Sequence, residues 1–398
     1  MAHWRIVLWL LLVLPALVAR GEETLPVYVG LDGEFGLLNS TSAQAIEHGM
    51  LVALDEINAA GGVLGGRSLA LLTRDNRSVP ARGVENIRDF ARVRELVAVF
   101  GGRFSPVIME EVPVLHELGL PLLDPWGSAD GITAHKYHPS YTFRLSLRDS
   151  DAIPALLKFA AGERGARRVG LLLPNTAWGR SNLQAMQRYQ ARESVPAIVD
   201  PVWYNWGEHD MLRHYRALRE EGAEAIILVA NDIEGSLLVR QLADAAPEEL
   251  VPIISHWGVT GGRMVENSGE MLHKLDFTVL QTFSLFTADP ERRDSVMAVA
   301  RRLFGVRSIE QVESPVGFGQ AYDLLHILAR AINLAGTTDR AAIRTALEQV
   351  SDYQGLTGDY PAPFTAERHD AIRPEQLFMA RYRRDGVLVP LSVSGSDP

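Results

Sequence analysis

The feature that most constrains the fold of this chain is a regular alternation of short apolar runs with amphipathic segments. Runs rich in Val, Leu and Ile, such as Leu25–Leu31, Leu96–Phe100 and Arg168–Pro174, are predicted strands. Segments with helical spacing follow them, which is typical of a parallel sheet covered by helices on both faces. Because the alternation runs once and restarts at Arg168, we predict an α/β protein with two doubly wound lobes. The apolar segment Leu275–Phe286 is long for one strand, and we expect it to pass between the lobes.

The first 21 residues have the pattern of an export signal. Arg5 precedes an apolar run from Ile6 to Val18, and Ala19-Arg20-Gly21 offers a small-x-small cleavage site. Pro15 interrupts the run, which is also short for a transmembrane helix. We therefore predict a signal peptide over 1–21, with a retained membrane anchor as the alternative.

The composition narrows the classes of function. The chain has 398 residues, a net charge of −10 and no Cys. The length fits two domains of ordinary size, and the acidity argues against a nucleic-acid partner, because nucleic acids attract basic surfaces. Without Cys there is no disulfide framework and no cysteine to carry a lipid anchor. We therefore expect a periplasmic protein that is secreted and not lipid-anchored.

No motif in the sequence specifies catalysis, a metal or a cofactor. A nucleophile-elbow G-x-S-x-G, a P-loop and a full dinucleotide fingerprint are all missing. Two histidine couples, His135 with His138 and His209 with His214, lack further ligands at a metal spacing. We therefore expect no enzymatic activity, no metal and no cofactor.

The stretch Leu96–Thr133 carries the first candidate for a binding site. After its first strand and Gly101-Gly102, Ser105 stands where an N-cap belongs and Pro106 where the first helical residue belongs. The free N–H groups of such a helix start, at the carboxyl end of a parallel strand, can seat a carboxylate. The next strand ends at Pro125-Trp126-Gly127-Ser128, which would bring an indole and a hydroxyl to the same crevice. The alternative is that Ser105 only caps its helix.

Four segments, spread over most of the chain, carry a resemblance to a known family. They are GMLVALDEINAAGGVLGGRSLALLTRDN (Gly49–Asn76), VFGGRFSPVIMEEVPVLHELGLPLLDP (Val99–Pro125), GFGQAYDLLHILARAINLAGTTDRAAIRTALEQV (Gly317–Val350) and YQGLTGDYPAPFTAERHDA (Tyr353–Ala371). In this order they resemble the type I periplasmic binding proteins of ABC importers, specifically the branched-chain amino acid (Leu/Ile/Val) and amide-binding family.

The resemblance implies two lobes joined by a hinge of three crossings, with the ligand bound between them. The first lobe would comprise residues 25–145 and 282–350. The second would comprise residues 146–281 and 351–398. Closure onto a ligand would then be a hinge motion whose equilibrium the ligand shifts by touching both lobes.

The family's ligand contacts map onto this sequence residue by residue. Ser105 matches the Ser that holds the ligand carboxylate, and Gly127 with Ser128 matches a backbone and hydroxyl pair in the next loop. Trp178 stands where an aromatic residue of the second lobe closes on the ligand. Trp257 stands where amino-acid binders supply an acid for the ligand ammonium. An indole cannot form that ion pair, although its face attracts a cation by ~0.5–2 kcal/mol.

This departure leaves the anionic partner of the ligand open. Asp232 and Glu234, after the predicted strand Ala225–Ala230, are candidates to replace it. Arg103 is a candidate for a bidentate contact to a ligand carboxylate.

The predicted pocket is richer in aromatic groups than an aliphatic amino acid needs. Trp126, with Phe104 nearby, would join the two tryptophans that the resemblance places there. We expect a ligand with a flat or cationic portion and one acceptor group. The alternative for each Trp is a place in the core or on an inter-lobe surface. For the cluster of Trp203, Tyr204 and Trp206, surface or core is the favoured interpretation.

The sequence therefore predicts an extracytoplasmic solute-binding protein. It would capture a small ligand (an amino acid, an amide, or an aromatic or cationic analogue) and deliver it to the permease of an ABC importer. The first alternative is a binding subunit that reports its ligand to a membrane kinase or cyclase. The second is an exported hydrolase. The fold alone does not separate transport from sensing.

Overall fold

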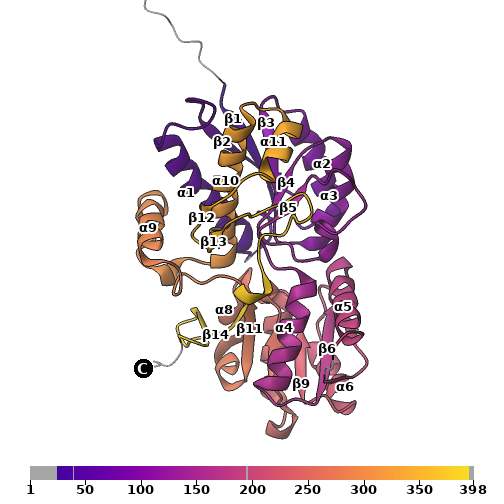
Figure 1. The fold of residues 1–398 in the computed structure, drawn as a ribbon. Helices are drawn as coiled ribbons and strands as arrows, with labels where there is room; N and C mark the ends of the chain where they lie inside the picture. The colour runs from indigo at the N-terminus through magenta and orange to yellow at the C-terminus, as the bar shows by residue number, and fades with distance from the viewer. Residues whose placement is uncertain (1–24, 39, 194–195, 394–398) are drawn as a thin grey trace, which may run out of the picture.

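The computed structural model describes residues 25–38, 40–193 and 196–393. The predicted signal peptide, 1–21, lies outside the described residues. Two α/β lobes, each built on its own sheet, lie one above the other in Figure 1, which confirms the predicted fold class. No helix in the described part of the chain has both the length and the apolarity needed to cross a bilayer.

The sheet of the first lobe has five parallel strands in the order β2-β1-β3-β4-β5. The strands are β1 (Val27–Gly33), β2 (Leu69–Asp75), β3 (Leu96–Phe100), β4 (Leu122–Asp124) and β5 (Thr142–Arg144). All five residues of β3 are buried, as in a strand with helices on both faces.

The helices of the first lobe come from two separate parts of the chain. They are α1 (Ser42–Ala59), α2 (Pro80–Ala91), α3 (Ser105–Glu117), α9 (Pro290–Phe304), α10 (Pro315–Ala335) and α11 (Arg340–Leu347). The long helix α10 packs along α1. Gly49 makes this close approach possible, because a Cβ there would lie 2.1 Å from the carbonyl oxygen of Phe318.

The sheet of the second lobe has the order β15-β14-β11-β10-β9-β6-β7, with β8 also paired to β6. Its strands are β6 (Arg168–Pro174), β7 (Ala197–Ile198), β8 (Val202–Tyr204), β9 (Ala225–Leu228), β10 (Ile253–Ser255), β11 (Phe277–Gln281), β14 (Phe378–Tyr382) and β15 (Leu388–Pro390). The strands up to β11 are parallel, whereas β14 and β15 add antiparallel.

The helices of the second lobe include four of ten or more residues. They are α4 (Asp149–Gly162), α5 (Ala177–Gln190), α6 (Met211–Glu220) and α7 (Asp232–Gln241), with the shorter α8 (Met264–Ser268) and a 3₁₀ turn, η4 (Trp257–Thr260). The strand predicted within Leu275–Phe286 is only five residues long, and the chain beyond it leads to α9, which packs on α1 of the first lobe.

The contacts of the C-terminal segment bear on the predicted boundary at residue 351, which stays a prediction. The hairpin of β12 (Tyr353–Gln354) and β13 (Asp359–Tyr360) lies against α10, where the Tyr353 hydroxyl donates to Asp323 at 2.7 Å. We therefore propose that residues 353–371 belong to the first lobe and that only the chain from about 374 onward belongs to the second.

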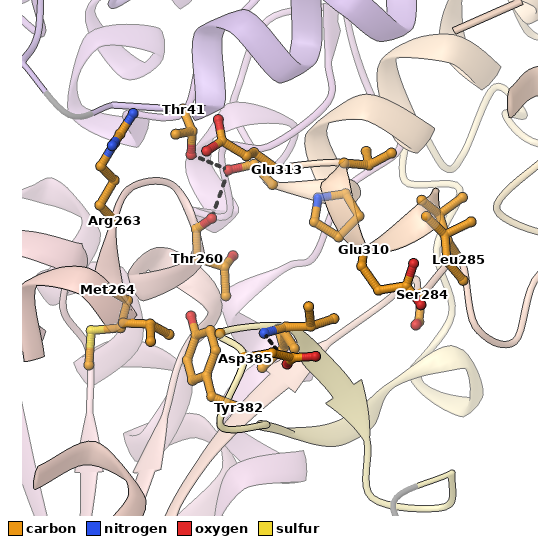
Figure 2. Close-up of a pocket in the computed structure, with 18 of the residues that line it drawn as sticks. Thr41, Thr260, Arg263, Met264, Ser284, Leu285, Glu310, Glu313, Tyr382 and Asp385 are labelled. Carbon is orange, nitrogen blue, oxygen red and sulfur yellow. Dashed lines mark hydrogen bonds between the residues drawn. The ribbon is translucent and has the colours of Figure 1, made fainter. Parts of the chain in front are cut away.

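Polar contacts hold the two lobes together on the side that Figure 2 shows. Thr41 and Ser314 of the first lobe share a hydroxyl–hydroxyl hydrogen bond of 2.7 Å, and Ser314 donates to the carbonyl of Thr260 at 2.8 Å. The backbone N–H of Thr41 also donates to the carbonyl of Gly261. Because Thr260 and Gly261 belong to the second lobe, the structure is a closed state.

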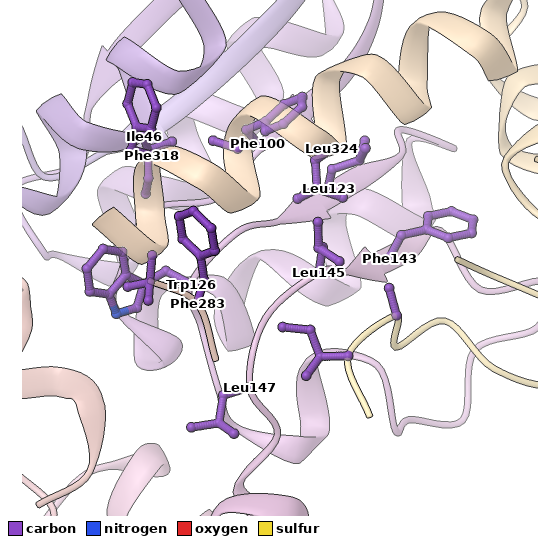
Figure 3. Packing of buried hydrophobic residues seen from close by; sticks show 14 of the residues in the cluster. Ile46, Phe100, Leu123, Trp126, Phe143, Leu145, Leu147, Phe283, Phe318 and Leu324 are labelled. Atoms are coloured by element: carbon purple, nitrogen blue, oxygen red, sulfur yellow. The ribbon is translucent and has the colours of Figure 1, made fainter. Parts of the chain in front are cut away.

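The main apolar core runs through the first lobe and continues into the second, where it includes Leu171, Ile227 and Ile254. Figure 3 shows part of this cluster, in which Phe100, Leu123 and Phe143 lie on strands of the first sheet and Leu324 lies on α10. Trp126 lies at its edge, with the indole nitrogen pointing away from the apolar side chains.

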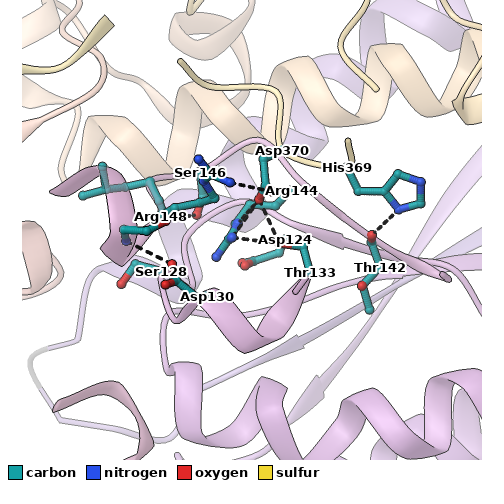
Figure 4. Close-up of polar contacts among 12 residues, drawn as sticks. Asp124, Ser128, Asp130, Thr133, Thr142, Arg144, Ser146, Arg148, His369 and Asp370 are labelled. Atoms are coloured by element: carbon teal, nitrogen blue, oxygen red, sulfur yellow. Dashed lines mark hydrogen bonds and ion pairs between the residues drawn. The ribbon is translucent and has the colours of Figure 1, made fainter. Parts of the chain in front are cut away.

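An ion-pair network joins the chain at the end of β5 to the C-terminal segment around Asp370. Arg144 donates through Nε to Asp370 at 2.7 Å, and the guanidinium of Arg148 lies 3.6 Å from the same carboxylate (Figure 4). Burial alone would raise the pKa of Asp370, but the charges of Arg144 and Arg148 outweigh burial and hold it below its ordinary value. Arg144 and Arg148 therefore tie the chain that leaves β5 to the C-terminal segment at Asp370. Arg144 also donates to the carbonyl of Ala129, in the loop that carries Ser128.

Candidate functional site

A small pocket between the lobes gathers seven of the predicted binding residues. From the first lobe come Arg103, Phe104, Ser105, Trp126 and Ser128, and from the second come Trp178 and Trp257. Its other lining residues are Pro106, Trp206, Asn231 and Gly258. The cavity has a volume of about 10 Å³, which is about the room that one water molecule occupies. The lobes are thus closed on this pocket, and a larger ligand requires them to part or the indoles to turn.

Ser105 is the first residue of α3 rather than its N-cap. Phe104 occupies the N-cap position and makes no side-chain cap. The Ser105 hydroxyl oxygen instead accepts hydrogen bonds from the backbone N–H groups of Ser128, at 3.0 Å, and Ala129, at 3.2 Å. Ser105 therefore ties the start of α3 to the loop after β4.

Gly127 lies behind the pocket wall and does not line the pocket. Its backbone N–H donates to Oδ1 of Asp124 at 2.7 Å, and the N–H of Trp126 donates to the same oxygen at 3.0 Å. Complete burial raises the pKa of Asp124 to about 7. Asp124 thus fixes the loop that carries Trp126 and Ser128, and it occupies the N–H of Gly127 that the sequence offered to a ligand.

Trp178 enters the pocket from the start of α5. Its indole N–H donates to Oδ1 of Asp149 at 3.3 Å, and Nε2 of His256 lies 3.2 Å from the same oxygen. Gly179 permits this tight strand-to-helix turn, because a Cβ there would lie 1.9 Å from the carbonyl oxygen of Pro174. Asp149, at the start of α4, therefore holds the Trp178 indole, whereas His256 lies beside it without a hydrogen bond to either ring nitrogen within the described residues.

Aromatic rings from the two lobes meet across the pocket. The ring centroids of Trp126 and Trp257 are 5.8 Å apart, and those of Phe104 and Trp206 are 5.4 Å apart in an edge-on arrangement. Trp206 lines the pocket and also packs against the apolar core of the second lobe, so its favoured interpretation as a surface or core residue stays a prediction. Tyr204 is buried and donates to the carbonyl of Val229 at 2.8 Å, as a core residue does.

The predicted charged residues pair within the protein. Arg103 and Asp232 form an ion pair of 2.8 Å between the lobes, with side chains 4% and 2% exposed. Glu234 accepts a hydrogen bond from the backbone N–H of Gly207 at 3.2 Å, and burial raises its pKa. Neither Asp232 nor Glu234 lines the pocket.

Asn231, Trp206 and Pro106 are the side chains of the pocket that we did not predict as ligand contacts. Asn231 precedes α7 and lies just beyond the carboxyl end of β9, a position at which parallel sheets commonly bind ligands. The position of Asn231 directly after a predicted strand could therefore have been used to predict it as a ligand contact. Trp206 follows the short strand β8, and its pattern in the sequence is equally typical of a buried residue.

A second cavity, of about 320 Å³, lies next to the contact of Thr41 with Ser314 (Figure 2). None of the predicted site residues lines it. Among the residues that the structure describes, no three His, Cys, Asp or Glu side chains are grouped as a metal site would require.

Comparison with known proteins agrees with this architecture. Residues 26–386 match the family described as periplasmic binding protein. The Leu/Ile/Val-binding protein homolog 2 of Brucella abortus is 23% identical over 374 residues, which cover 93% of this chain and 95% of the relative.

The solved structures that are similar to this one include two with a bound ligand named. The branched-chain amino acid transporter substrate-binding protein LivJ from Streptococcus pneumoniae, in complex with isoleucine, has a TM-score of 0.75 at 20% identity and covers 92% of this chain and 99% of its own. An ABC transporter solute-binding protein from R. palustris, in complex with 4-hydroxybenzoate, has a TM-score of 0.75 at 17% identity and covers 92% of this chain and 95% of its own. At these identities the likeness shows the shared fold.

Proposed function

The chain belongs to the periplasmic binding protein family, and from that premise we propose that it captures a small organic solute between its lobes and delivers it to an ABC importer. The observation that carries the proposal is the convergence of both lobes on one aromatic pocket. Residues from the loops after β3, β4, β6, β8, β9 and β10 line it together. A solute held there contacts both lobes, so that binding favours the closed state.

The closed contacts explain how binding and shape are coupled. The ion pair of Arg103 with Asp232 and the hydrogen bonds around Ser314 form only when the lobes meet. A solute that adds contacts to both walls shifts the hinge equilibrium further toward this state, and a permease can then distinguish loaded from empty protein.

The class of solute follows from the family and from the pocket. One structural relative is titled as a complex with isoleucine and another as a complex with 4-hydroxybenzoate. The pocket of this chain is lined by four indoles and Phe104, with Ser105 and Ser128 as hydroxyl groups. We infer a compact organic solute related to these compounds, and a binding role without catalysis in the space outside the cytoplasm.

The experiment is a ligand screen on the mature protein. Candidate amino acids, amides, aromatic carboxylates and quaternary amines are tested for their effect on the melting temperature. A true ligand at a hundredfold excess over its Kd stabilises the folded state by about 2.7 kcal/mol, because it binds only that state. Native mass spectrometry of protein purified from its own host identifies any solute already bound. The proposal is contradicted if no compound shifts the melting temperature and the native protein carries no small molecule.

A further inference from the structure

The pocket contains hydrogen-bond donors that the protein itself leaves without an acceptor. The indole nitrogens of Trp126 and Trp206 are buried and make no hydrogen bond within the described residues. The Nε of Arg103 is also buried and makes no hydrogen bond within the described residues. Indole and guanidinium nitrogens can only donate, and buried donors in native proteins nearly always have a partner. These three groups therefore call for acceptors from outside the chain.

The hydroxyl of Ser105 adds a fourth donor. Its oxygen already accepts two backbone N–H groups, from Ser128 and Ala129. Both lone pairs are then in use, which leaves the hydroxyl hydrogen to donate. The side chains of Asn231 and Ser128 can act in either direction, so no lining side chain is an obligate acceptor.

The nearby carboxylates do not line the pocket. Asp232 pairs with Arg103, and Glu234 accepts the backbone N–H of Gly207. Oδ1 of Asp149 accepts the indole N–H of Trp178, whereas its Oδ2 is buried without a hydrogen bond within the described residues. No Asp or Glu lines the pocket in the part of the chain that the structure describes. An ammonium group bound here would lose its hydration without gaining a counter-ion. The attraction of an indole face for the cation offsets only part of that free-energy cost.

We infer that the solute is an aromatic carboxylate without an amino group, an inference that rests on the proposed function. The cavity of about 10 Å³ is too small for such a solute, so the lobes part or the indoles turn to admit it. Its ring then lies among the indoles of Trp126, Trp178, Trp206 and Trp257, and its carboxylate accepts from the indole N–H groups of Trp126 and Trp206. The hydroxyl of Ser105 donates to the same carboxylate. This assignment excludes the zwitterionic α-amino acids, because their ammonium has no partner in the pocket.

The test compares compounds that share a ring and differ in charge. Isothermal titration calorimetry at pH 7 measures 3-phenylpropionate, phenylalanine and 2-phenylethylamine, together with benzoate, 4-hydroxybenzoate, indole-3-acetate and leucine. At least one aromatic carboxylate is expected to bind about tenfold more tightly than phenylalanine, because one unpaired buried charge is worth that factor or more. No measurable binding is expected for 2-phenylethylamine.

Tighter binding of leucine, phenylalanine or the amine than of every carboxylate overturns the inference and leaves solute capture intact. Failure of all the carboxylates overturns it as well. Solute capture itself fails only if, in addition, the broad screen finds no ligand and the protein from its own host carries none.

Two variants test the donors while keeping an aromatic ring. Trp126→Phe and Trp206→Phe each remove one N–H group and are expected to weaken the carboxylate on the order of tenfold, as for a hydrogen bond to a charged group. Trp203→Phe is the matched control: Trp203 lies on β8, packs against the main core and does not line the pocket. It should leave the affinity unchanged within about twofold.

Melting temperatures of the unliganded variants show whether each one folds. Because Trp206 is not part of the fully buried core, its variant keeps the test valid if Trp126→Phe does not fold. Affinity equal to that of the parent protein in a folded Trp206→Phe overturns the role assigned to that N–H.

Discussion

The ion pair between Arg103 and Asp232 is expected to act as a latch between the lobes. Arg103 follows β3 in the first lobe, Asp232 begins α7 in the second, and their charged atoms lie 2.8 Å apart with both side chains almost fully buried. Asp232→Asn removes the negative charge while keeping the shape. In the closed state Arg103 is then buried without a counter-ion, whereas in the open state water can solvate it.

The size of the effect follows from this difference. Breaking a buried pair by removing one partner costs about 3–5 kcal/mol. Because asparagine still offers an oxygen to the guanidinium, we take the lower end, about 3 kcal/mol, which changes the ratio of closed to open protein by about two orders of magnitude. The loss of a negative charge at the start of α7 acts in both states and cancels from this ratio.

The assay is the distance between the lobes in solution. The chain has no Cys, so Lys136→Cys in the first lobe and Glu220→Cys in the second, both at exposed positions, can carry a pair of spin labels. Pulsed EPR should show that Asp232→Asn shifts the distance between the two spin labels in the unliganded protein from that of the closed state to a longer value. Calorimetry should show a correspondingly weaker ligand affinity.

A matched control and a double variant separate the latch from general destabilisation. Asp276→Asn breaks the pair with Arg164 within the second lobe, where the side chains are 41% and 24% exposed, and should not change the inter-lobe distance. Arg103→Met combined with Asp232→Leu removes both charges and should restore part of the closed population. A distance distribution in Asp232→Asn that equals that of the parent protein would refute the latch.

Three further predictions concern stability. Ser105→Ala removes the acceptor of two backbone N–H groups and should lower the free energy of unfolding, measured in urea, by about 1–3 kcal/mol. The control Ser295→Ala, at an exposed position on α9, should leave this free energy unchanged. Equal losses of stability in the two variants would contradict the reasoning. Because burial raises the pKa of Asp124 from 3.8 to about 7, the folded state binds more protons than the unfolded state between these values, so this group's contribution to stability falls as pH rises through that window. Asp124→Asn should remove that part of the slope, by a few kcal/mol at about 1.4 kcal/mol per pKa unit, and an unchanged slope in urea titrations at pH 4.5 and 7 would count against it. Gly179→Ala places a Cβ against backbone and should cost about 1–3 kcal/mol in the same assay, whereas Gly162→Ala, which meets open space at the end of α4, should be neutral or slightly stabilising; a neutral Gly179→Ala would be inconsistent with the turn described here.

Part of the site could be predicted because of the way α/β folds are built. Residues that follow the strands of a parallel sheet gather at one edge of it. Local patterns in the sequence were therefore sufficient to mark Ser105 after β3 and Trp126 after β4 as neighbours. Trp178 follows β6 of the other sheet, and only the family resemblance predicted it beside them. The structure places all three in one pocket.

Other parts of the site could not be predicted, because they depend on contacts between distant residues. Arg103 and Asp232 are 129 residues apart in the chain, and each by itself has the chemistry of a ligand contact. Because the two side chains pair with each other, neither charge is available to pair with a ligand. Trp206 illustrates the opposite case, since an indole next to a short strand is equally typical of the core and of a pocket.

The sequence by itself determined the alternation of strands and helices, the two lobes and the order of the loops between them. It could do so because hydrophobic periodicity and glycine turns act over a few neighbouring residues. Only the tertiary structure decided which buried donors are left without an acceptor and which carboxylates are already paired. Hydrogen bonds and ion pairs depend on distances in space, and the folded chain brings together groups that the sequence keeps far apart.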